Sequence, residues 1–252
     1  MERLTLPDVV EDFAAEAAAL DELLAGMDDA DWSRPTPAEG WDVRDTVSHL
    51  ADTDDLAHDC ATGGPRDLMT EAITAGSGEA FTHGQVLKGR DRTPSEVHDW
   101  WRTSNERLRD ALLRVDPAHR IPWGPNQMSP VSFTTARLME TWAHSLDCHA
   151  AVEREPVDTD RIRHVAFIGL RALPYALGTR GLQLSGPVRL ELTGPSGDEW
   201  TLGPPGAPTV IRGSASDWCR VVTHRDRGDE RSRLGASGPD ADRILTHAQA
   251  YL

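Results

Sequence analysis

A glutamate and a histidine spaced four residues apart are the side chains of this sequence best suited to chemistry. Glu140 and His144 lie within the segment 136–150. In a helix, this spacing separates two side chains by about 6 Å along the axis and about 40° around it, so a carboxylate and an imidazole project together. Such a pair is half of a divalent-metal site, and a complete site needs at least one further protein ligand.

His49 is the best candidate for the third ligand. It lies in the segment 40–50, where Val43, Val47 and Leu50 recur at helical spacing, so the histidine is expected to point inward. A single inward histidine is more often a hydrogen-bonded residue of the core than a metal ligand. The spacing alone leaves both interpretations open.

Four long helices are predicted to position these residues. Cap residues mark their starts and apolar residues at helical spacing mark their inner faces. Helices of this length with short-to-medium connections form antiparallel bundles, which bind metals between facing helices. The predicted helices cover residues 5–27, 42–62, 93–115 and 129–153. The weak pattern at 66–92 predicts a short helix at 67–74, and a segment as long as 66–92 between bundle helices is expected to border the mouth of the site.

The pattern changes after Pro156, where alternation with a period of two replaces the helical period. The chain is therefore predicted to be α+β, with a helical metal-binding domain at 1–156 and an α+β domain at 157–252. In the second domain the predicted helices cover 159–177, 216–223 and 239–251, and the predicted strands cover 188–192, 200–202, 209–212 and 233–236.

Two motifs resemble a known family. The sequence G-W-D-V-R-D-x-V-x-H-L at 40–50 and R-L-M-E-T-W-A-H-S-x-D at 137–147 are similar to those of the DinB-like, mycothiol-dependent maleylpyruvate isomerase family, in particular an actinobacterial branch described as metal-binding proteins. The resemblance covers most of the chain, including P-S-G-x-x-W-T-x-G-P at 195–204 and G-P-D-A-D-R-I-L at 238–245.

This resemblance implies a fold, a ligand set and a cosubstrate. It implies a DinB-like four-helix bundle followed by a small sterol-carrier-like α+β domain. Position by position, the metal triad of the family falls on His49, Glu140 and His144. It also implies that mycothiol is the cosubstrate.

Two histidines and one carboxylate leave a divalent ion such as zinc with open coordination positions, which is typical of a catalytic site. The ion would bind a small thiol as its thiolate and lower the thiol pKa. In the isomerase family the thiol adds to an activated double bond and is later eliminated, whereas other relatives transfer the thiol to an electrophile. The alternatives are a non-catalytic carrier with a structural metal, and a lyase or hydrolase that uses metal-bound water.

Two further residues are weaker candidates for the reaction. Arg225 has the fork geometry that binds a carboxylated substrate, although a solvated surface arginine is the simpler interpretation. Cys148 lies one turn beyond His144, so it is a possible fourth ligand or reactive thiol, but a small buried residue is favoured.

Other polar residues near the triad are expected to support it. Asp45, one turn before His49, is the most economical carboxylate to orient a histidine ligand, and Asp147 and His149 are interpreted as packing or supporting groups. On the helix at 42–62, Cys60 is about 16 Å from His49 along the axis and His58 points to the opposite face, so neither is expected to share its ion.

Composition limits the partners. The chain has 26 Lys+Arg against 41 Asp+Glu, and this net charge of -15 argues against nucleic acid as a partner. No run of apolar residues is long enough to cross a membrane, the N-terminus lacks the apolar core of a signal peptide, and three cysteines cannot form a disulfide framework. We therefore expect a cytoplasmic monomer or homodimer that acts on a small molecule.

Overall fold

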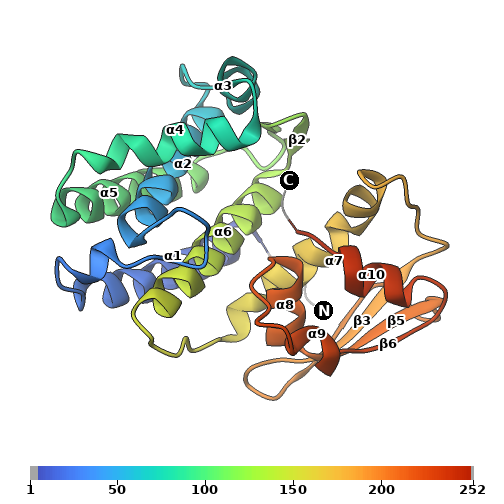
Figure 1. Cartoon of the computed structure of the whole chain (residues 1–252). Coiled ribbons are helices and arrows are strands. Elements are labelled where there is room, and N and C mark those ends of the chain that lie inside the picture. Colours follow the sequence, from blue (N-terminus) through green and yellow to red (C-terminus); the bar gives the residue numbers. More distant parts are fainter. Residues whose placement is uncertain (1–4, 251–252) are drawn as a thin grey trace. The chain divides into compact units, whose positions relative to one another are not determined.

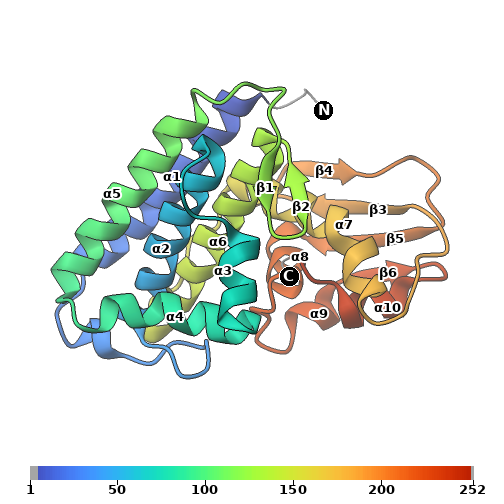
Figure 2. The ribbon, with the colours of Figure 1, turned by 90° about the horizontal axis from the view of Figure 1, so that it is seen from above.

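The structure is a computed structural model that describes residues 5–250. Contacts along the chain divide it into two compact units, Met1–Pro156 and Val157–Leu252. The first unit is helical and the second combines helices with a sheet (Figures 1 and 2). The α+β fold class is therefore confirmed.

The first unit contains the four predicted long helices. They are α1, α2, α5 and α6, and two additional helices, α3 and α4, connect α2 to α5 (Figure 1). The helix α2 packs against α4, α5 and α6. The bounds are α1 Leu6–Ala25, η1 Asp31–Ser33, α2 Val43–Thr62, α3 Leu68–Ala75, α4 Gly78–Arg90, α5 Pro94–Leu112, β1 Ile121–Trp123, β2 Asn126–Met128 and α6 Pro130–Ala151.

Side-chain caps explain where these helices begin. Thr5 and Thr93 each form a capping box with the acidic residue three positions later, and each is followed closely by proline. Asp42 accepts a hydrogen bond from the backbone N–H of Asp45 at the start of α2, and Gly63 ends α2 in the left-handed conformation. These caps satisfy backbone groups that a helix end otherwise leaves without partners.

The segment between α2 and α5 differs from its prediction. A short helix was expected at 67–74, and α3 occupies that position, but α4 is a second and longer helix that begins after the cap Ser77. Gly78, Gly84 and Gly89 weaken the helical pattern of α4 in the sequence. Its inner face packs on α2, so tertiary contacts favour a helix that propensity alone does not predict.

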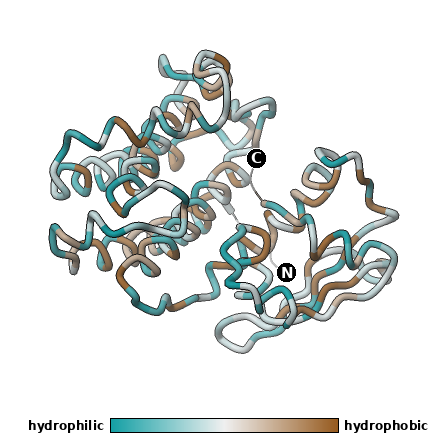
Figure 3. The backbone as a smooth tube through the Cα atoms, viewed as in Figure 1, coloured by the Kyte–Doolittle hydropathy of each residue, from teal (hydrophilic) through white to brown (hydrophobic). Residues whose placement is uncertain are grey.

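The core of the bundle is apolar around α1, α2 and α5. Leu20, Val47, Leu50 and Trp101 are buried together there. Cys148 of α6 belongs to the same cluster. Hydrophobic and hydrophilic residues alternate along the helices, as expected for amphipathic helices that cover a common core (Figure 3).

The second unit is built on a four-stranded sheet with the order β4-β3-β5-β6. Strands β3 and β5 are parallel, whereas the pairs β3–β4 and β5–β6 are antiparallel. The strands predicted at 188–192 and 200–202 correspond to β3 and β4, whereas the short helix α9 was not predicted. The bounds are η2 Asp160–Ile162, α7 Arg163–Gly178, β3 Val188–Thr193, β4 Glu199–Leu202, β5 Thr209–Ser214, α8 Ala215–Val222, α9 Glu230–Arg233, β6 Gly235–Ser237 and α10 Ala241–His247.

Side chains alternate across this sheet. Leu190 and Leu192 are buried, whereas Glu191 between them lies on the other face with Arg189 and Arg212. Pro174 lies inside α7, which continues to Gly178. The predicted end of the last helix at Tyr251 lies outside the described residues. Across residues 5–250, no helix has the length and apolar character to span a membrane.

Candidate functional site

Helices α2 and α6 bring His49, Glu140 and His144 together. One ligand atom from each residue lies within 4.8 Å of those of the other two, and in the described part of the chain this is the one group of three such residues arranged to hold a metal ion. Nε2 of His49 lies 3.6 Å from Oε2 of Glu140, and Nε2 of His144 lies 3.7 Å from the same oxygen. The two imidazole rings meet edge to face with centroids 5.0 Å apart.

Asp147 fixes the orientation of His144. Its Oδ2 lies 3.0 Å from Nδ1 of His144. A carboxylate accepts hydrogen bonds, so Nδ1 carries a proton and Nε2 is the ring nitrogen that faces Glu140. Asp147 had been interpreted as a packing or supporting group, and its contact is the carboxylate–histidine pair typical of metal ligands.

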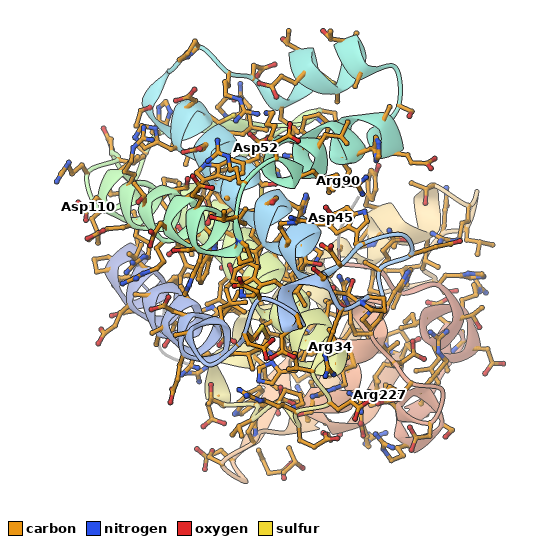
Figure 4. The ribbon with its side chains drawn as sticks, turned by 60° about the vertical axis from the view of Figure 1, so that its left-hand side comes forward. Arg34, Asp45, Asp52, Arg90, Asp110 and Arg227 are labelled. Carbon is orange, nitrogen blue, oxygen red and sulfur yellow. The ribbon has the colours of Figure 1, made fainter. Side chains whose placement is uncertain are left out.

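A different residue from the predicted one contacts His49. Asp45 does not bond to His49, because its two carboxylate oxygens accept hydrogen bonds from Arg90 of α4, at 3.2 and 2.9 Å. Figure 4 shows Asp45 on α2 and Arg90 on α4 near one another. Instead, Oε1 of Gln85 lies 3.1 Å from Nδ1 of His49. The expectation that Asp45 orients His49 was therefore wrong.

Electrostatics favour an ionised carboxylate between the two histidines. Burial opposes the ionisation of Glu140, but the adjacent imidazoles of His144 and His49, with Arg137 nearby, hold its pKa well below its usual range. Burial lowers the pKa of His49, and Glu140 only partly offsets this effect. The favoured state is a carboxylate beside a neutral His49, and these are the ligand forms that a metal ion requires.

Trp41 forms an aromatic wall beside both histidines. Its ring lies parallel to His144 with centroids 6.0 Å apart, and it is tilted against His49 at 5.2 Å. It directly precedes Asp42, the cap of α2, so the start of this helix also sets the position of the wall. The sequence motif contained Trp41 but gave no reason to assign it this contact.

The donor set fits a divalent ion. Two ligands of a tetrahedral ion, each at about 2.0–2.2 Å from it, are roughly 3.4 Å apart. The separations of 3.6 and 3.7 Å match this value closely. Three protein ligands of the N, N and O type would leave a coordination position of such an ion open.

Cys148 is not part of this arrangement. It is fully buried among apolar side chains of α1, α2 and α5. Burial raises the pKa of its thiol, with Asp147 adding to the effect, so the reactive thiolate is disfavoured. The interpretation of Cys148 as a small buried residue accounts for these observations.

The remaining candidates lie elsewhere. Arg225 is in the second unit, where its guanidinium donates a hydrogen bond to the carbonyl oxygen of Thr223, and its role towards a substrate stays a prediction. His58 and Cys60 line a separate cavity of about 730 Å³ near the C-terminal ends of α2 and α5, and no triad residue lines that cavity. His149 contacts the carbonyl oxygen of Ser145 on its own helix.

Comparison with solved structures shows the fold. Crystal structures of the mycothiol-dependent maleylpyruvate isomerase and of a mutant of it match with TM-scores of 0.60 and 0.61 at 18% sequence identity. Each match covers 94% of this chain and 96% of the other chain. The similarity therefore extends over both units.

Sequence comparison identifies the family. Two uncharacterized proteins of Mycobacterium tuberculosis, from strains CDC 1551 / Oshkosh and ATCC 25618 / H37Rv, are 38% identical over 245 residues, which is 96% of this chain and 94% of each relative. The family model of the mycothiol maleylpyruvate isomerase N-terminal domain matches residues 13–149. Because that segment is more than half of the chain and includes His49, Glu140 and His144, the chain belongs to the mycothiol maleylpyruvate isomerase family.

Proposed function

We propose that the protein is a metal-dependent enzyme that uses a low-molecular-weight thiol, mycothiol, to isomerise a small unsaturated substrate. The observation that carries this proposal is the convergence of Nε2 of His49, Nε2 of His144 and Oε2 of Glu140 on one point. Membership of the mycothiol maleylpyruvate isomerase family supports isomerisation over thiol transfer.

The triad would hold the metal. A divalent ion there, for which zinc is a suitable choice, supplies Lewis acidity that lowers the pKa of a thiol in the open position. Asp147 keeps the proton of His144 on Nδ1, away from the ligand atom. Trp41 covers one side of the two histidines and excludes water from it.

The thiol would have to come from outside the protein. Cys148 is one turn from His144 but is buried, and burial raises its thiol pKa. In the proposed reaction the sulfur forms a bond to one carbon of an activated double bond, and the π electrons move onto the conjugated carbonyl. The remaining single bond rotates, and elimination restores the double bond and releases the thiol. The net reaction consumes neither thiol nor electrons.

A thiol titration tests this function. We expect the zinc-loaded protein to convert a cis-unsaturated diacid such as maleylpyruvate, as followed by absorbance, only when mycothiol is present. Treatment with a chelator should abolish turnover, and added zinc should restore it. The Cys148→Ala variant is the control for a protein thiol and should keep the rate of the parent protein.

Two results would contradict the proposal. A full rate in thiol-free buffer would favour hydrolysis or lyase chemistry with metal-bound water. Loss of activity in Cys148→Ala with metal retained would make that residue the nucleophile. If the protein binds an apolar ligand and shows no thiol-dependent turnover of any unsaturated acid, a carrier function would replace the enzyme.

A further inference from the structure

In each histidine of the triad, Nε2 faces Glu140 and Nδ1 faces another group. Nδ1 of His49 contacts an amide, whereas Nδ1 of His144 contacts a carboxylate. The amide belongs to Gln85 of α4, a residue with 2% of its surface exposed. Its Oε1 lies 3.1 Å from Nδ1 of His49, and its Nε2 lies 3.0 Å from Oγ1 of Thr53. Thr53 in turn bonds to His49, because its hydroxyl donates a hydrogen bond to the backbone carbonyl oxygen of His49 at 2.7 Å.

This closed chain of hydrogen bonds fixes the direction of the amide. A threonine hydroxyl has one proton, and Thr53 gives it to the carbonyl of His49. Its oxygen can then only accept from Gln85, so the NH₂ group of Gln85 faces Thr53 and the carbonyl oxygen faces His49. A carbonyl oxygen accepts, so Nδ1 of His49 carries the proton and Nε2 presents its lone pair.

We propose that Gln85 is a positioning residue that holds His49 in the tautomer with the proton on Nδ1, and that Thr53 sets the polarity of the amide. The lone pair of Nε2 then points towards Glu140, from 3.6 Å. That Nε2 of His49 binds a metal ion rests on the proposed function, whereas the assignment of the tautomer does not. The role of Gln85 towards His49 matches that of Asp147 towards His144, with a neutral acceptor in place of a charged one.

The close approach of α4 to α2 allows Gln85 to reach His49. A Cβ atom on Gly89 would lie 1.7 Å from Oγ of Ser48, so only glycine permits this separation of the two helices. The hydroxyl of Ser48 is itself bonded to the carbonyl oxygen of Arg44, which keeps it in place. Gln85 precedes Gly89 by one helical turn and therefore lies on the same face of α4.

Two ion pairs secure the same face. Lys88 lies 2.7 Å from Asp52, and Arg90 lies 2.9 Å from Asp45, so charged contacts with α2 flank Gly89 on either side. The helix α4 thus has a defined position relative to His49. This accounts for a helix whose own sequence pattern is weak.

The tautomer can be measured without metal. In metal-free protein labelled with ¹⁵N-histidine at about pH 8, where the imidazole is neutral, two-bond and three-bond ¹⁵N–¹H couplings distinguish the tautomers. We expect His49 with its proton on Nδ1 in the parent protein and a mixture in Gln85→Ala. Gln85→Glu keeps an acceptor and should restore the Nδ1 proton. Thr53→Ser should match the parent protein, whereas Thr53→Val should allow the amide to reverse and give a mixture.

Zinc affinity provides the second measurement. Competition with a chromophoric chelator should show that Gln85→Ala binds about 10- to 100-fold more weakly, the range typical for groups that orient a metal ligand. Gln85→Glu should recover most of this loss. Leu87→Ala is the matched control, because Leu87 lies on the exposed side of α4, and it should leave zinc affinity and tautomer unchanged.

The outcomes separate this proposal from the proposed function. A parent protein with the His49 proton on Nε2, or a folded Gln85→Ala variant with unchanged tautomer and unchanged zinc affinity, would overturn the role of Gln85. A parent protein that binds no zinc but shows the expected tautomer, lost in Gln85→Ala, would support the role of Gln85 and contradict the metal site.

Discussion

Helix α2 and strand β3 differ in where their polar residues lie. In β3, polar residues face away from the core, and Glu191 bonds to Arg189 and Arg212 on that face. In α2, polar residues lie on the buried side as well. The buried polar residues of α2 are Asp45, Thr46, Ser48, Asp52, Thr53 and Asp54.

The difference indicates where function constrains the sequence. A buried charge is unfavourable unless it is paired, so a buried polar face is not expected of a helix selected for stability alone. Each buried carboxylate of α2 has a cationic partner on another helix or loop, such as Arg90 for Asp45 and Arg66 for Asp52. These pairs surround the segment that carries His49. The sheet, by contrast, obtains its register from apolar alternation.

The largest expected effect is at the triad. Substituting His49, Glu140 or His144 by alanine should weaken zinc binding by more than about 100-fold, beyond the range for groups that only orient ligands. Elemental analysis after gel filtration measures retained metal, and far-ultraviolet circular dichroism checks that the helices persist. Glu191→Ala in the sheet is the control and should retain the metal. Full metal content in His49→Ala would contradict the triad.

The next largest effect is expected at the buried ion pair of Arg137 and Asp54. Arg137 lies three residues before Glu140 on α6. The guanidinium of Arg137 bonds to Asp54 at 2.9 and 3.0 Å, and the two side chains are 1% and 0% exposed. Arg137→Met should lower the free energy of unfolding by about 3–5 kcal/mol, because Asp54 would be left buried without its cation. Urea denaturation measures this change. The double variant Arg137→Met, Asp54→Leu is the control and should recover much of the loss.

The pH dependence of Arg137→Met follows from Asp54. Burial raises the pKa of Asp54 even beside Arg137, so without the arginine its folded-state pKa should rise further. The folded state then binds more protons than the unfolded state, and stability falls as pH rises from the unfolded pKa through the folded pKa. The variant should therefore regain stability as the pH is lowered from 7 towards about 5. A deficit independent of pH over this interval would contradict the charge explanation.

Much of the fold was predictable because it depends on local signals. Thr93 and Asp42 mark helix starts through their side-chain caps, and alternation around Leu190 identifies a strand. The hairpin of β1 and β2 was missed because strands of three residues give no measurable alternation. That 1–156 and 157–252 fold as separate domains stays a prediction, which the unfolding of each unit alone would test.

The site was predictable only where its residues share an element. Glu140 and His144 follow from their spacing, but His49 required the family resemblance. Gln85 could not be found, because it acts from another helix and lies 36 positions after His49 in the sequence. Asp45 was assigned wrongly for the same reason, since its partner Arg90 lies 45 residues away. Partners across helices depend on packing that no local pattern contains.

A smaller effect is expected where a residue supports a ligand. Asp147→Asn keeps an acceptor for Nδ1 of His144 but removes the charge, so zinc affinity should fall by about 10-fold, at the lower end of the range for such groups. Competition with a chelator measures the change. Asp147→Ala should lose more than Asp147→Asn, and equal affinity in both variants and the parent would show that Asp147 serves packing alone.

The smallest effect is expected on the sheet. Glu191→Gln removes the carboxylate that bonds to Arg189 and Arg212, but these groups face water, where screening leaves exposed ion pairs little net value. The melting temperature at pH 7 should shift by less than about 2 °C, and about 1 M salt should reduce the difference further.

The hydrogen bond from Arg189, with Arg212 adding to it, lowers the pKa of Glu191. The contribution of Glu191 to stability is therefore present above the unfolded pKa and is lost as pH falls through the folded pKa. Parent and variant should thus melt together near pH 3, below the ordinary range of a glutamate. If Glu191→Gln instead lowers the melting temperature as much as Arg137→Met, exposed and buried charges contribute alike in this chain, and the contrast between β3 and α2 has no functional meaning.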